Sequence, residues 1–401
     1  MELLCLAAVF AAIVILLSLR RPMYQAMLGG IAATLLLYRI PLIECLRQPL
    51  DVVRNWSSLS VIISIYLITC LQRLMESREQ IRLAQADLDG LVHNRRVNAA
   101  VAPMFIGLMP SAAAMLLCGD IVREATDGYL EREEQAVLTT WFRHIPESTL
   151  PTYAGVLLMA QLSKVPMGEY LLGMIVPNIA MIALGWFFFL RKLPKDPGTA
   201  PSSNRAQDAM HLVLHLWPLL LIIVLIIGCK VPVTAALLLS IVLAALSYRT
   251  APKEFLAVLR RAVEPKLLGN TTMVLVLKEF IDYTGVLQTV PQMLDGLPLP
   301  PYLAFVIMFF IGPIISGSAG TIAMGTTLAF TTLNGGMPLM VLLMCTVHAS
   351  MQLSPTHVCL PVAAEDFHVT LGQLIRKTAP LSMIFLGLML LYYHVLLFLV
   401  G

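Results

Sequence analysis

The sequence predicts an all-α polytopic membrane protein with an inverted structural repeat of 5+5 transmembrane helices plus two re-entrant hairpins. Three observations predict it: an apolar composition, a duplicated segment interrupted by Gly, Pro and Ser, and a one-sided distribution of basic residues. The 401-residue chain is 58% hydrophobic and only 13% charged, about half the charged fraction of soluble domains. A soluble core cannot absorb so many apolar residues, so lipid is the expected solvent.

Apolar stretches of roughly 17 to 25 residues, enough to cross a bilayer, recur along the chain. The first is expected to be a span and not a cleaved signal, because no basic region precedes it and no small-residue cleavage site follows. The ten expected spans are 2–18, 24–42, 57–74, 135–163, 168–190, 211–228, 232–248, 267–285, 337–366 and 380–399.

The duplicated segment is the most informative feature of the chain. Residues 105–114 read FIGLMPSAAA and residues 310–319 read FIGPIISGSA, and an Asp-Gly-Leu precedes each copy at 89–91 and 295–297. Two copies of one interrupted apolar segment are typical of carriers built from duplicated halves. We therefore expect re-entrant hairpins at 97–123 and 301–330.

Basic residues support this topology. With the N- and C-termini outside and both hairpins re-entrant, 20 of the 27 Lys and Arg residues lie inside, four lie outside and three lie within spans. This asymmetry follows the positive-inside rule of the cell (inner) membrane. Arg47 and Arg54 oppose it, and we expect them on a short interfacial helix.

The predicted organisation has three parts. Residues 1–190 form the first repeat, 191–210 a cytoplasmic linker rich in Pro, Ser and charge, and 211–401 the inverted second repeat. Because each repeat has an odd number of spans, the hairpins open to opposite sides of the membrane. Segments 76–96 and 249–266 mix charged and apolar residues, which indicates interfacial helices.

The hairpin tips are candidate substrate-binding elements. Irregular backbone at membrane depth is tolerated only where protein or water surrounds it, and the start of each returning half-helix offers free N–H groups to an anion. The candidate residues are Ser111 and Ala112 in the first tip and Ser316, Gly317 and Ser318 in the second. The alternative is close helix packing through the small residues Gly312, Ser316 and Gly320.

The span after the first hairpin carries Arg143, His144 and Glu147. Ionisable residues inside a membrane segment are expensive and normally functional. The planar guanidinium of Arg143 suits a substrate carboxylate, and His144 and Glu147 are candidates for ion coupling. The alternative is that Arg143 and Glu147, four residues apart, neutralise each other.

The span after the second hairpin carries Ser354, Thr356 and His357 around a helix-breaking Pro355. Ser354 and Thr356 are candidate substrate contacts, and His357 is a candidate proton carrier. The seven cysteines form no Cys-x-x-Cys and are expected to be packing residues. A metal site from Cys345, His348, His357 and Cys359 matches no standard spacing, so no metal is expected.

Other classes of function lack their motifs. The chain has no nucleotide-binding Gly-x-x-x-x-Gly-Lys loop and no His-Glu-x-x-His or Gly-x-Ser-x-Gly. We therefore expect no catalytic residues, no enzyme activity and no cofactor other than Na⁺ or H⁺ as coupling ion. The net charge of +3 follows membrane topology and indicates no nucleic-acid partner.

The motif residues resemble a known family. Trp141–Glu147 with Pro151–Gly155, and Ser354–Leu360, are similar to the two motifs of the domain of unknown function 401 family, within the ion transporter superfamily of gluconate and dicarboxylate carriers. The first tip departs from the family pattern, which has a Pro and paired glycines where this chain reads PSAAA at 110–114. The resemblance implies an inverted-repeat transporter of small organic anions.

These observations together predict a secondary active transporter of a small organic anion, a carboxylate, coupled to Na⁺ or H⁺ and working by alternating access. The first alternative is a Na⁺/H⁺ antiporter on the same scaffold, and a remote alternative is an intramembrane enzyme. The expected partners are the anionic substrate and the lipid bilayer, with a homodimer left open.

Overall fold

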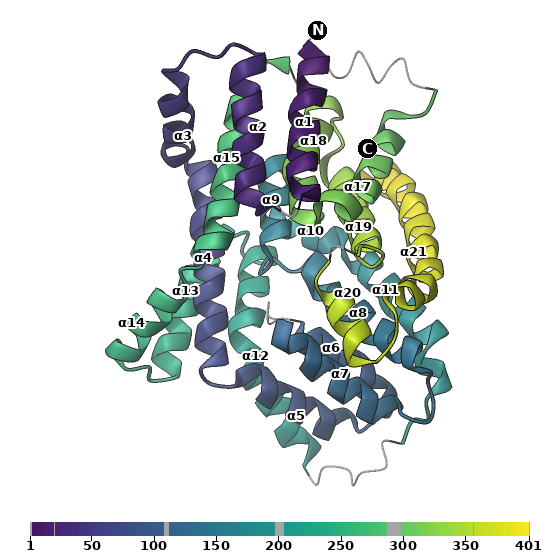
Figure 1. The fold of residues 1–401 in the computed structure, drawn as a ribbon. Helices are drawn as coiled ribbons and strands as arrows, with labels where there is room; N and C mark the ends of the chain where they lie inside the picture. The colour runs from purple at the N-terminus through teal and green to yellow at the C-terminus, as the bar shows by residue number, and fades with distance from the viewer. Residues whose placement is uncertain are drawn as a thin grey trace.

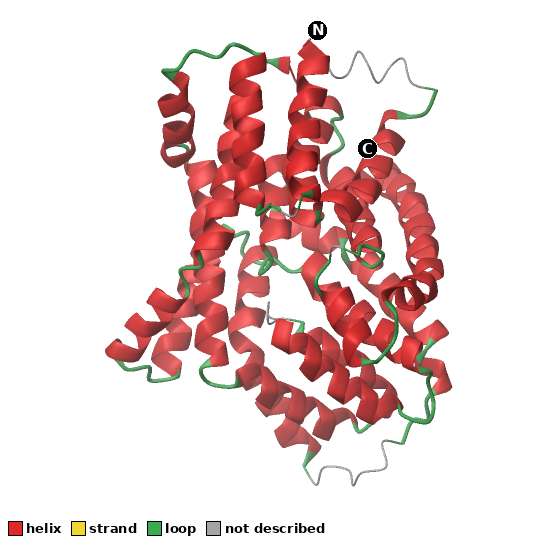
Figure 2. Cartoon of the chain, viewed as in Figure 1, coloured by secondary structure: helices red, strands yellow, loops and turns green. Residues whose placement is uncertain are grey.

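The computed structural model describes residues 2–19, 21–107, 112–196, 204–286, 298–355 and 357–400. Throughout these ranges the chain forms helices joined by turns and loops, and they contain no strand (Figure 2). The all-α prediction is therefore confirmed for the described residues.

The helices of the first half follow the expected spans closely. Predicted span 2–18 is a helix with those same limits, and span 135–163 is two helices separated by a short break. The elements are α1 Glu2–Ser18, α2 Met23–Leu37, α3 Glu44–Arg54, α4 Trp56–Glu76, α5 Gln80–Val92, α6 Arg95–Ile106, α7 Ala112–Thr126, α8 Arg132–Thr149, α9 Ala154–Ser163, α10 Met167–Gly173 and α11 Ile175–Phe188, followed by the 3₁₀ turn η1 Leu190–Lys192.

The second half has a similar order, although its described residues contain no helix in the place of α5. A helical pair is followed by a short amphipathic helix, a long helix, a hairpin, a broken helix and a terminal helix. The elements are α12 Arg205–Ile227, α13 Val233–Ser247, α14 Pro252–Arg261, α15 Pro265–Thr284, α17 Pro301–Ser316, α18 Ser318–Thr332, α19 Gly336–Met351, α20 Cys359–Asp366 and α21 Leu371–Val400.

Within the described ranges, four helices are long and apolar enough to cross a membrane, judged by length and composition: Trp56–Glu76, Met167–Phe188 (α10 and α11 together), Arg205–Ile227 and Leu371–Leu399. Five shorter apolar helices accompany them. Many apolar side chains of these helices are exposed, for example Val213 and Leu214 of α12. Helices with apolar outer faces fit a polytopic membrane protein.

Arg47 and Arg54, which opposed the charge rule, lie on the separate helix α3. Its buried residues Glu44, Gln48 and Val52 repeat every four positions, so one face of the helix meets the protein. It packs against α15, whereas α14 packs against α4. The short helix predicted for these two arginines is thus confirmed.

Helices of the two halves are interleaved. Helix α2 packs against α15, and α13 packs against α4, where Ser64 and Thr234 share a hydrogen bond of 2.7 Å. Similarly, α9 packs against α18 and α7 packs against α20. Helices from both halves of the chain therefore form the interior together.

The two hairpins lie toward opposite ends of the molecule. Figure 1 shows α6 and α7 in its lower half, and α17 and α18 near the N-terminus in its upper half. The arms of the second hairpin approach closely, since a Cβ added to Gly312 would lie 2.5 Å from Thr321 Oγ1. The tip between α6 and α7 includes Ser111 and lies outside the described residues.

The turn between α17 and α18 depends on Gly317, whose φ of 78° and ψ of 159° are essentially confined to glycine. We expect Gly317→Ala to destabilise the protein by about 1–3 kcal/mol. The cost would come from backbone strain alone, because the added Cβ would lie within 4 Å of no other atom. Gly387→Ala is the matched control: its site in α21 is equally open, and a helical Gly→Ala change gains about 0.5–1 kcal/mol. Thermal unfolding in detergent measures both, and equal shifts would contradict this account of the turn.

Candidate functional site

The interior is organised around α8 and α19, in which almost every side chain is buried. Each of these helices ends at a break that contains a proline, Pro151 after α8 and Pro355 after α19. Proline offers no N–H to a helix, so the chain leaves helical geometry there. The chain then continues as α9 or α20. Helix α9, from the first half of the chain, packs against α18 of the second hairpin, and α20, from the second half, packs against α7 of the first hairpin.

Polar side chains on α8 and α19 face one another in this interior. At such depth a polar group must find its partner within the protein. Ser148 Oγ and His348 Nδ1 lie 3.1 Å apart, and the edge of Trp141 packs on His348 with ring centroids 5.6 Å apart. We use the name polar seam for the set of buried polar residues Arg143, His144, Ser148, His348 and Ser350.

The segment before α20 adds His357 to this seam. The Nε2 atoms of His144 and His357 lie 2.8 Å apart, although the residues are 213 positions apart in sequence. Between two neutral imidazoles, one nitrogen donates and the other accepts. The contact therefore joins the two broken spans.

Arg143 is the only arginine among the buried residues of the described structure, with its side chain 5% exposed. Its Nη1 donates to Cys359 Sγ at 3.2 Å and lies 3.6 Å from Glu147 Oε2. The Glu147 side chain is 25% exposed, and the same oxygen lies 3.8 Å from His144 Nε2. Arg143 Nε finds no hydrogen-bond acceptor among the described residues. Glu147 thus offsets the charge of the guanidinium, but the two groups do not form a pair of parallel hydrogen bonds.

The first hairpin touches this arginine directly. Gly107 ends α6, and a Cβ added to it would lie 2.6 Å from the Arg143 carbonyl oxygen. The returning arm α7 is fixed to α20, because Arg123 Nη2 lies 2.9 Å from Asp366 Oδ2. The hairpin is therefore held on one side by α8 and on the other by the second half of the chain.

The second hairpin is connected to the seam through serine hydroxyls. Ser354 Oγ donates to the Pro313 carbonyl at 3.0 Å, and Ser350 Oγ donates to the Phe310 carbonyl. Both acceptors belong to α17, the arm that leads to Gly317. The Pro313 carbonyl also accepts from the Gly317 N–H at 3.1 Å, so the Ser354 hydroxyl is a second donor to it and adds a link between the second break and the hairpin arm.

An ion-pair cluster anchors the start of α8. Glu134 Oε1 lies 2.6 Å from Lys192 Nζ and 3.3 Å from Lys377 Nζ. Burial by itself raises the pKa of the Glu134 carboxyl, but the two lysines outweigh it and lower the pKa below the ordinary value. This cluster ties α8 to η1, which follows α11, and to α21.

The structure brings together four of the predicted site residues: Arg143, His144, Glu147 and His357. The predicted i,i+4 approach of Arg143 and Glu147 is present, so their mutual compensation and a substrate role are both compatible with the geometry. Ser354 bonds to the second hairpin. Of the remaining predicted residues, Ala112 begins α7, Ser316 ends α17, Gly317 and Ser318 form the turn into α18, and Ser111 and Thr356 lie outside the described residues.

Sequence reasoning missed three members of the site. Cys359 was expected to be a packing residue, but it accepts a hydrogen bond from Arg143. Ser148 and His348 were given no role, yet they link α8 with α19. Ser148 lies four residues after His144, on the same helical face, so its position was readable from the sequence. The contact with Cys359 was not.

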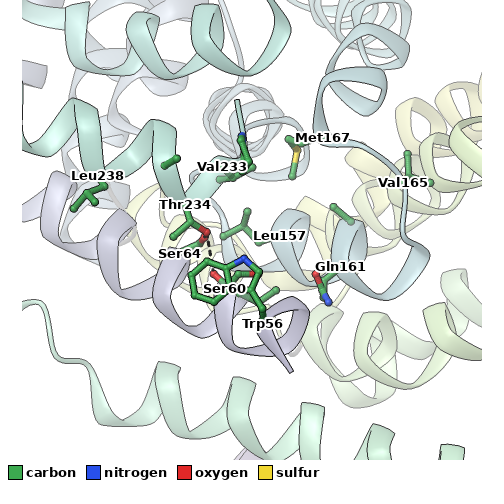
Figure 3. Close-up of a pocket in the computed structure, with 14 residues that line it drawn as sticks. Trp56, Ser60, Ser64, Leu157, Gln161, Val165, Met167, Val233, Thr234 and Leu238 are labelled. Atoms are coloured by element: carbon green, nitrogen blue, oxygen red, sulfur yellow. Dashed lines mark hydrogen bonds between the residues drawn. The ribbon is translucent and has the colours of Figure 1, made fainter. Parts of the chain in front are cut away.

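A cavity of about 450 Å³ lies beside the seam's first broken span, between α4, α9, α10 and α13. Figure 3 shows Trp56, Ser60 and Ser64 on one wall, with Gln161 and Thr234 on others. A second cavity of about 520 Å³ shares Met167, Pro232 and Val233 with it. None of the predicted site residues lines either cavity. The first cavity borders α9, which follows the break after α8.

These features define a helical membrane protein. Over 88% of this chain and 83% of the other, the structure is similar to Neisseria gonorrhoeae MtrF, with a TM-score of 0.54 and 12% identity. That structure is described as illuminating a class of antimetabolite efflux pumps. A search of curated protein sequences found no match.

The chain belongs to the family described as protein of unknown function DUF401, whose pattern matches residues 3–396. The family resemblance inferred from the two broken-span motifs is therefore confirmed over nearly the whole chain.

The contact between Gly107 and α8 gives a test of the site's construction. We expect Gly107→Ala to destabilise the protein by about 1–3 kcal/mol, because the new methyl group would meet a backbone oxygen that cannot rotate away. Gly269→Ala in α15 is the matched control, since nothing lies within 4 Å of its Cβ. Thermal unfolding in detergent compares them. A Gly107→Ala protein as stable as the control would show that the hairpin does not rest on Arg143.

Proposed function

We propose that this protein is a secondary active transporter of a small organic anion, a carboxylate, coupled to Na⁺ or H⁺. The observation that carries the proposal is Arg143: a buried guanidinium beside a helix break, with its Nε free of described acceptors and Glu147 held only at 3.6 Å. A planar guanidinium can bind a carboxylate with two parallel hydrogen bonds. An incompletely engaged arginine in a low-dielectric interior favours an anionic ligand.

The proposal includes an inverted repeat, with residues 1–190 and 211–401 as its halves, the linker 191–210 cytoplasmic and both termini outside. Its support is the reciprocity of the packing. The pair α2–α15 has its counterpart in α13–α4, α3–α15 in α14–α4, and α9–α18 in α20–α7. A two-fold relation between the halves accounts for all three sets of matching helix contacts. Hairpins at opposite ends of the molecule also fit a two-fold axis in the membrane plane (Figure 1).

The hairpin tips complete the proposed substrate site. The N-terminal ends of α7 and α18 offer free N–H groups and the positive end of a helix dipole, which would supplement Arg143. In this arrangement Ser111 and Ala112 contribute from the first tip and Ser316, Gly317 and Ser318 from the second. Ser354 and Thr356 would contribute from the second break.

Coupling is assigned to His144, Glu147 and His357. These groups form a continuous set, with 3.8 Å from Glu147 Oε2 to His144 Nε2 and 2.8 Å onward to His357 Nε2. A proton, or a cation at Glu147, would change the charge that Arg143 faces. This supports a linkage between anion binding and the driving ion. The likeness to an efflux pump supports carrier function in general and leaves the substrate to experiment.

The substrate role of Arg143 can be tested in purified protein. A thermal-shift screen of organic carboxylates, with and without Na⁺, should identify a stabilising anion. Arg143→Ala should then weaken binding of this anion by at least about tenfold, because at least one hydrogen bond to a charged group is lost. Arg143→Lys should restore only part of the affinity, because it keeps the charge without the fork.

Arg82→Ala serves as the control, since Arg82 is exposed and pairs only with Glu79 among the described carboxylates. Its anion-induced shift should equal that of the unmodified protein. Unfolding temperatures without ligand check that each variant is folded. Unchanged anion binding in a folded Arg143→Ala protein would exclude Arg143 from the site.

The contact between Glu147 and His144 also favours a second function, Na⁺/H⁺ antiport. Proteoliposomes with an imposed pH gradient separate the two. For an anion carrier, Na⁺ alone should leave the gradient unchanged and addition of the anion should start the flux. Dissipation by Na⁺ alone, abolished by Glu147→Gln, would support the antiporter instead.

A further inference from the structure

Cys359, together with the two histidines that face each other across the seam, forms a group whose chemistry goes beyond anion transport. The ligand atoms of His144, His357 and Cys359 all lie within 4.8 Å of one another. A fourth ligand group is close, because Glu147 Oε2 lies 3.8 Å from His144 Nε2. Two imidazoles, one thiol and one carboxylate thus meet in one partly buried place.

This donor set matches a defined class of metal ion. Imidazole and thiolate ligands select Zn²⁺ and neighbouring transition metals, whereas Mg²⁺ and Ca²⁺ take oxygen ligands. Bonds of about 2.0–2.3 Å in a tetrahedral site place ligand atoms roughly 3.3–3.8 Å apart. The separation of 2.8 Å between the histidine nitrogens therefore needs to open by about half an ångström, which is within the reach of side-chain rotation.

The group can also supply negative charge to a divalent cation. A thiolate at Cys359 and the Glu147 carboxylate would together carry two negative charges, and the ion would compete with Arg143 for Glu147, which lies 3.6 Å from Arg143 Nη1. Arg143 donates to Cys359 Sγ at 3.2 Å, and the thiolate is the form of cysteine that binds a metal ion. Such a donor to a ligand atom is the usual outer partner in metal sites, where it orients the ligand.

We propose that His144, His357 and Cys359, with Glu147 as fourth ligand, form a binding site for a transition metal ion of the Zn²⁺ class. The ion would join α8 to the start of α20, and so connect the two broken spans directly. It would also occupy the histidine nitrogens assigned to coupling. Binding would therefore hold the two spans together and oppose the transport cycle.

Co²⁺ is the probe for this site, because a cobalt–thiolate bond gives a near-ultraviolet absorption that other ligands do not. The full chain in detergent should bind about one equivalent of Co²⁺ with this absorption, and Zn²⁺ should displace it. Cys359→Ser should abolish the band, and His357→Gln should weaken binding by at least about tenfold.

Two controls match these variants. Cys345→Ser removes another buried thiol, which contacts Met174 Sδ at 3.9 Å, and should leave the band intact. His211→Ala removes a histidine that faces Asp87 on α5, far along the chain from the seam, and should also leave it intact. A band that survives Cys359→Ser, or disappears with His211→Ala, would overturn the assignment.

A measurement on the unmodified protein avoids dependence on variant folding. Metal binding should slow alkylation of Cys359, measured by mass spectrometry, while the exposed Cys229 reacts at an unchanged rate. Equal alkylation of Cys359 with and without Zn²⁺ would overturn the proposal. None of these experiments uses an anion, so the metal site and the anion site stand or fall separately.

Discussion

The burial of Arg143 is the constraint on which the rest of the site depends. An unpaired charge in an apolar interior is expensive, so a guanidinium at this depth needs nearby compensation. It comes from Glu147, one helical turn away, and from the sulfur of Cys359, which belongs to the other half of the chain. Satisfying Arg143 therefore requires the two broken spans to meet, and the contact of Gly107 with the Arg143 carbonyl adds the first hairpin to the same point.

The breaks in the two spans allow backbone groups, as well as side chains, to take part in this contact. A continuous apolar helix would present side chains to its neighbours but no backbone groups. Pro151 lies in the break between α8 and α9, and Pro355 in the break between α19 and α20. The chain that follows Pro355 brings His357 into contact with His144. Hydroxyls then donate to carbonyls of the hairpin arm, as Ser354 does to Pro313. Polar groups are thus concentrated where the backbone is irregular, and the surrounding helices can remain apolar toward lipid.

Sequence reasoning was strongest for features that depend on neighbouring residues. Hydropathy and Gly or Pro punctuation placed α1 and the two broken spans almost to the residue, and four-residue spacing placed Glu147 beside Arg143. It could not foresee contacts that depend on how distant segments meet. His144 and His357 are 213 positions apart, and no local pattern distinguishes Cys359 from a cysteine that only packs. Ser111 and Thr356 fall outside the described residues, so their roles stay predictions.

The position of Glu147 suggests how one arginine could serve both stability and transport. At 25% exposure Glu147 is the accessible member of the group, whereas Arg143 and His144 are enclosed. An incoming carboxylate that binds Arg143 with two hydrogen bonds would replace the looser compensation at 3.6 Å. Glu147 would then be left beside a second anionic group, the bound carboxylate, which favours its taking up a proton or a cation. In this scheme the coupling ion enters because the substrate has displaced the arginine's resident partner, and neither can leave alone without exposing an unbalanced charge.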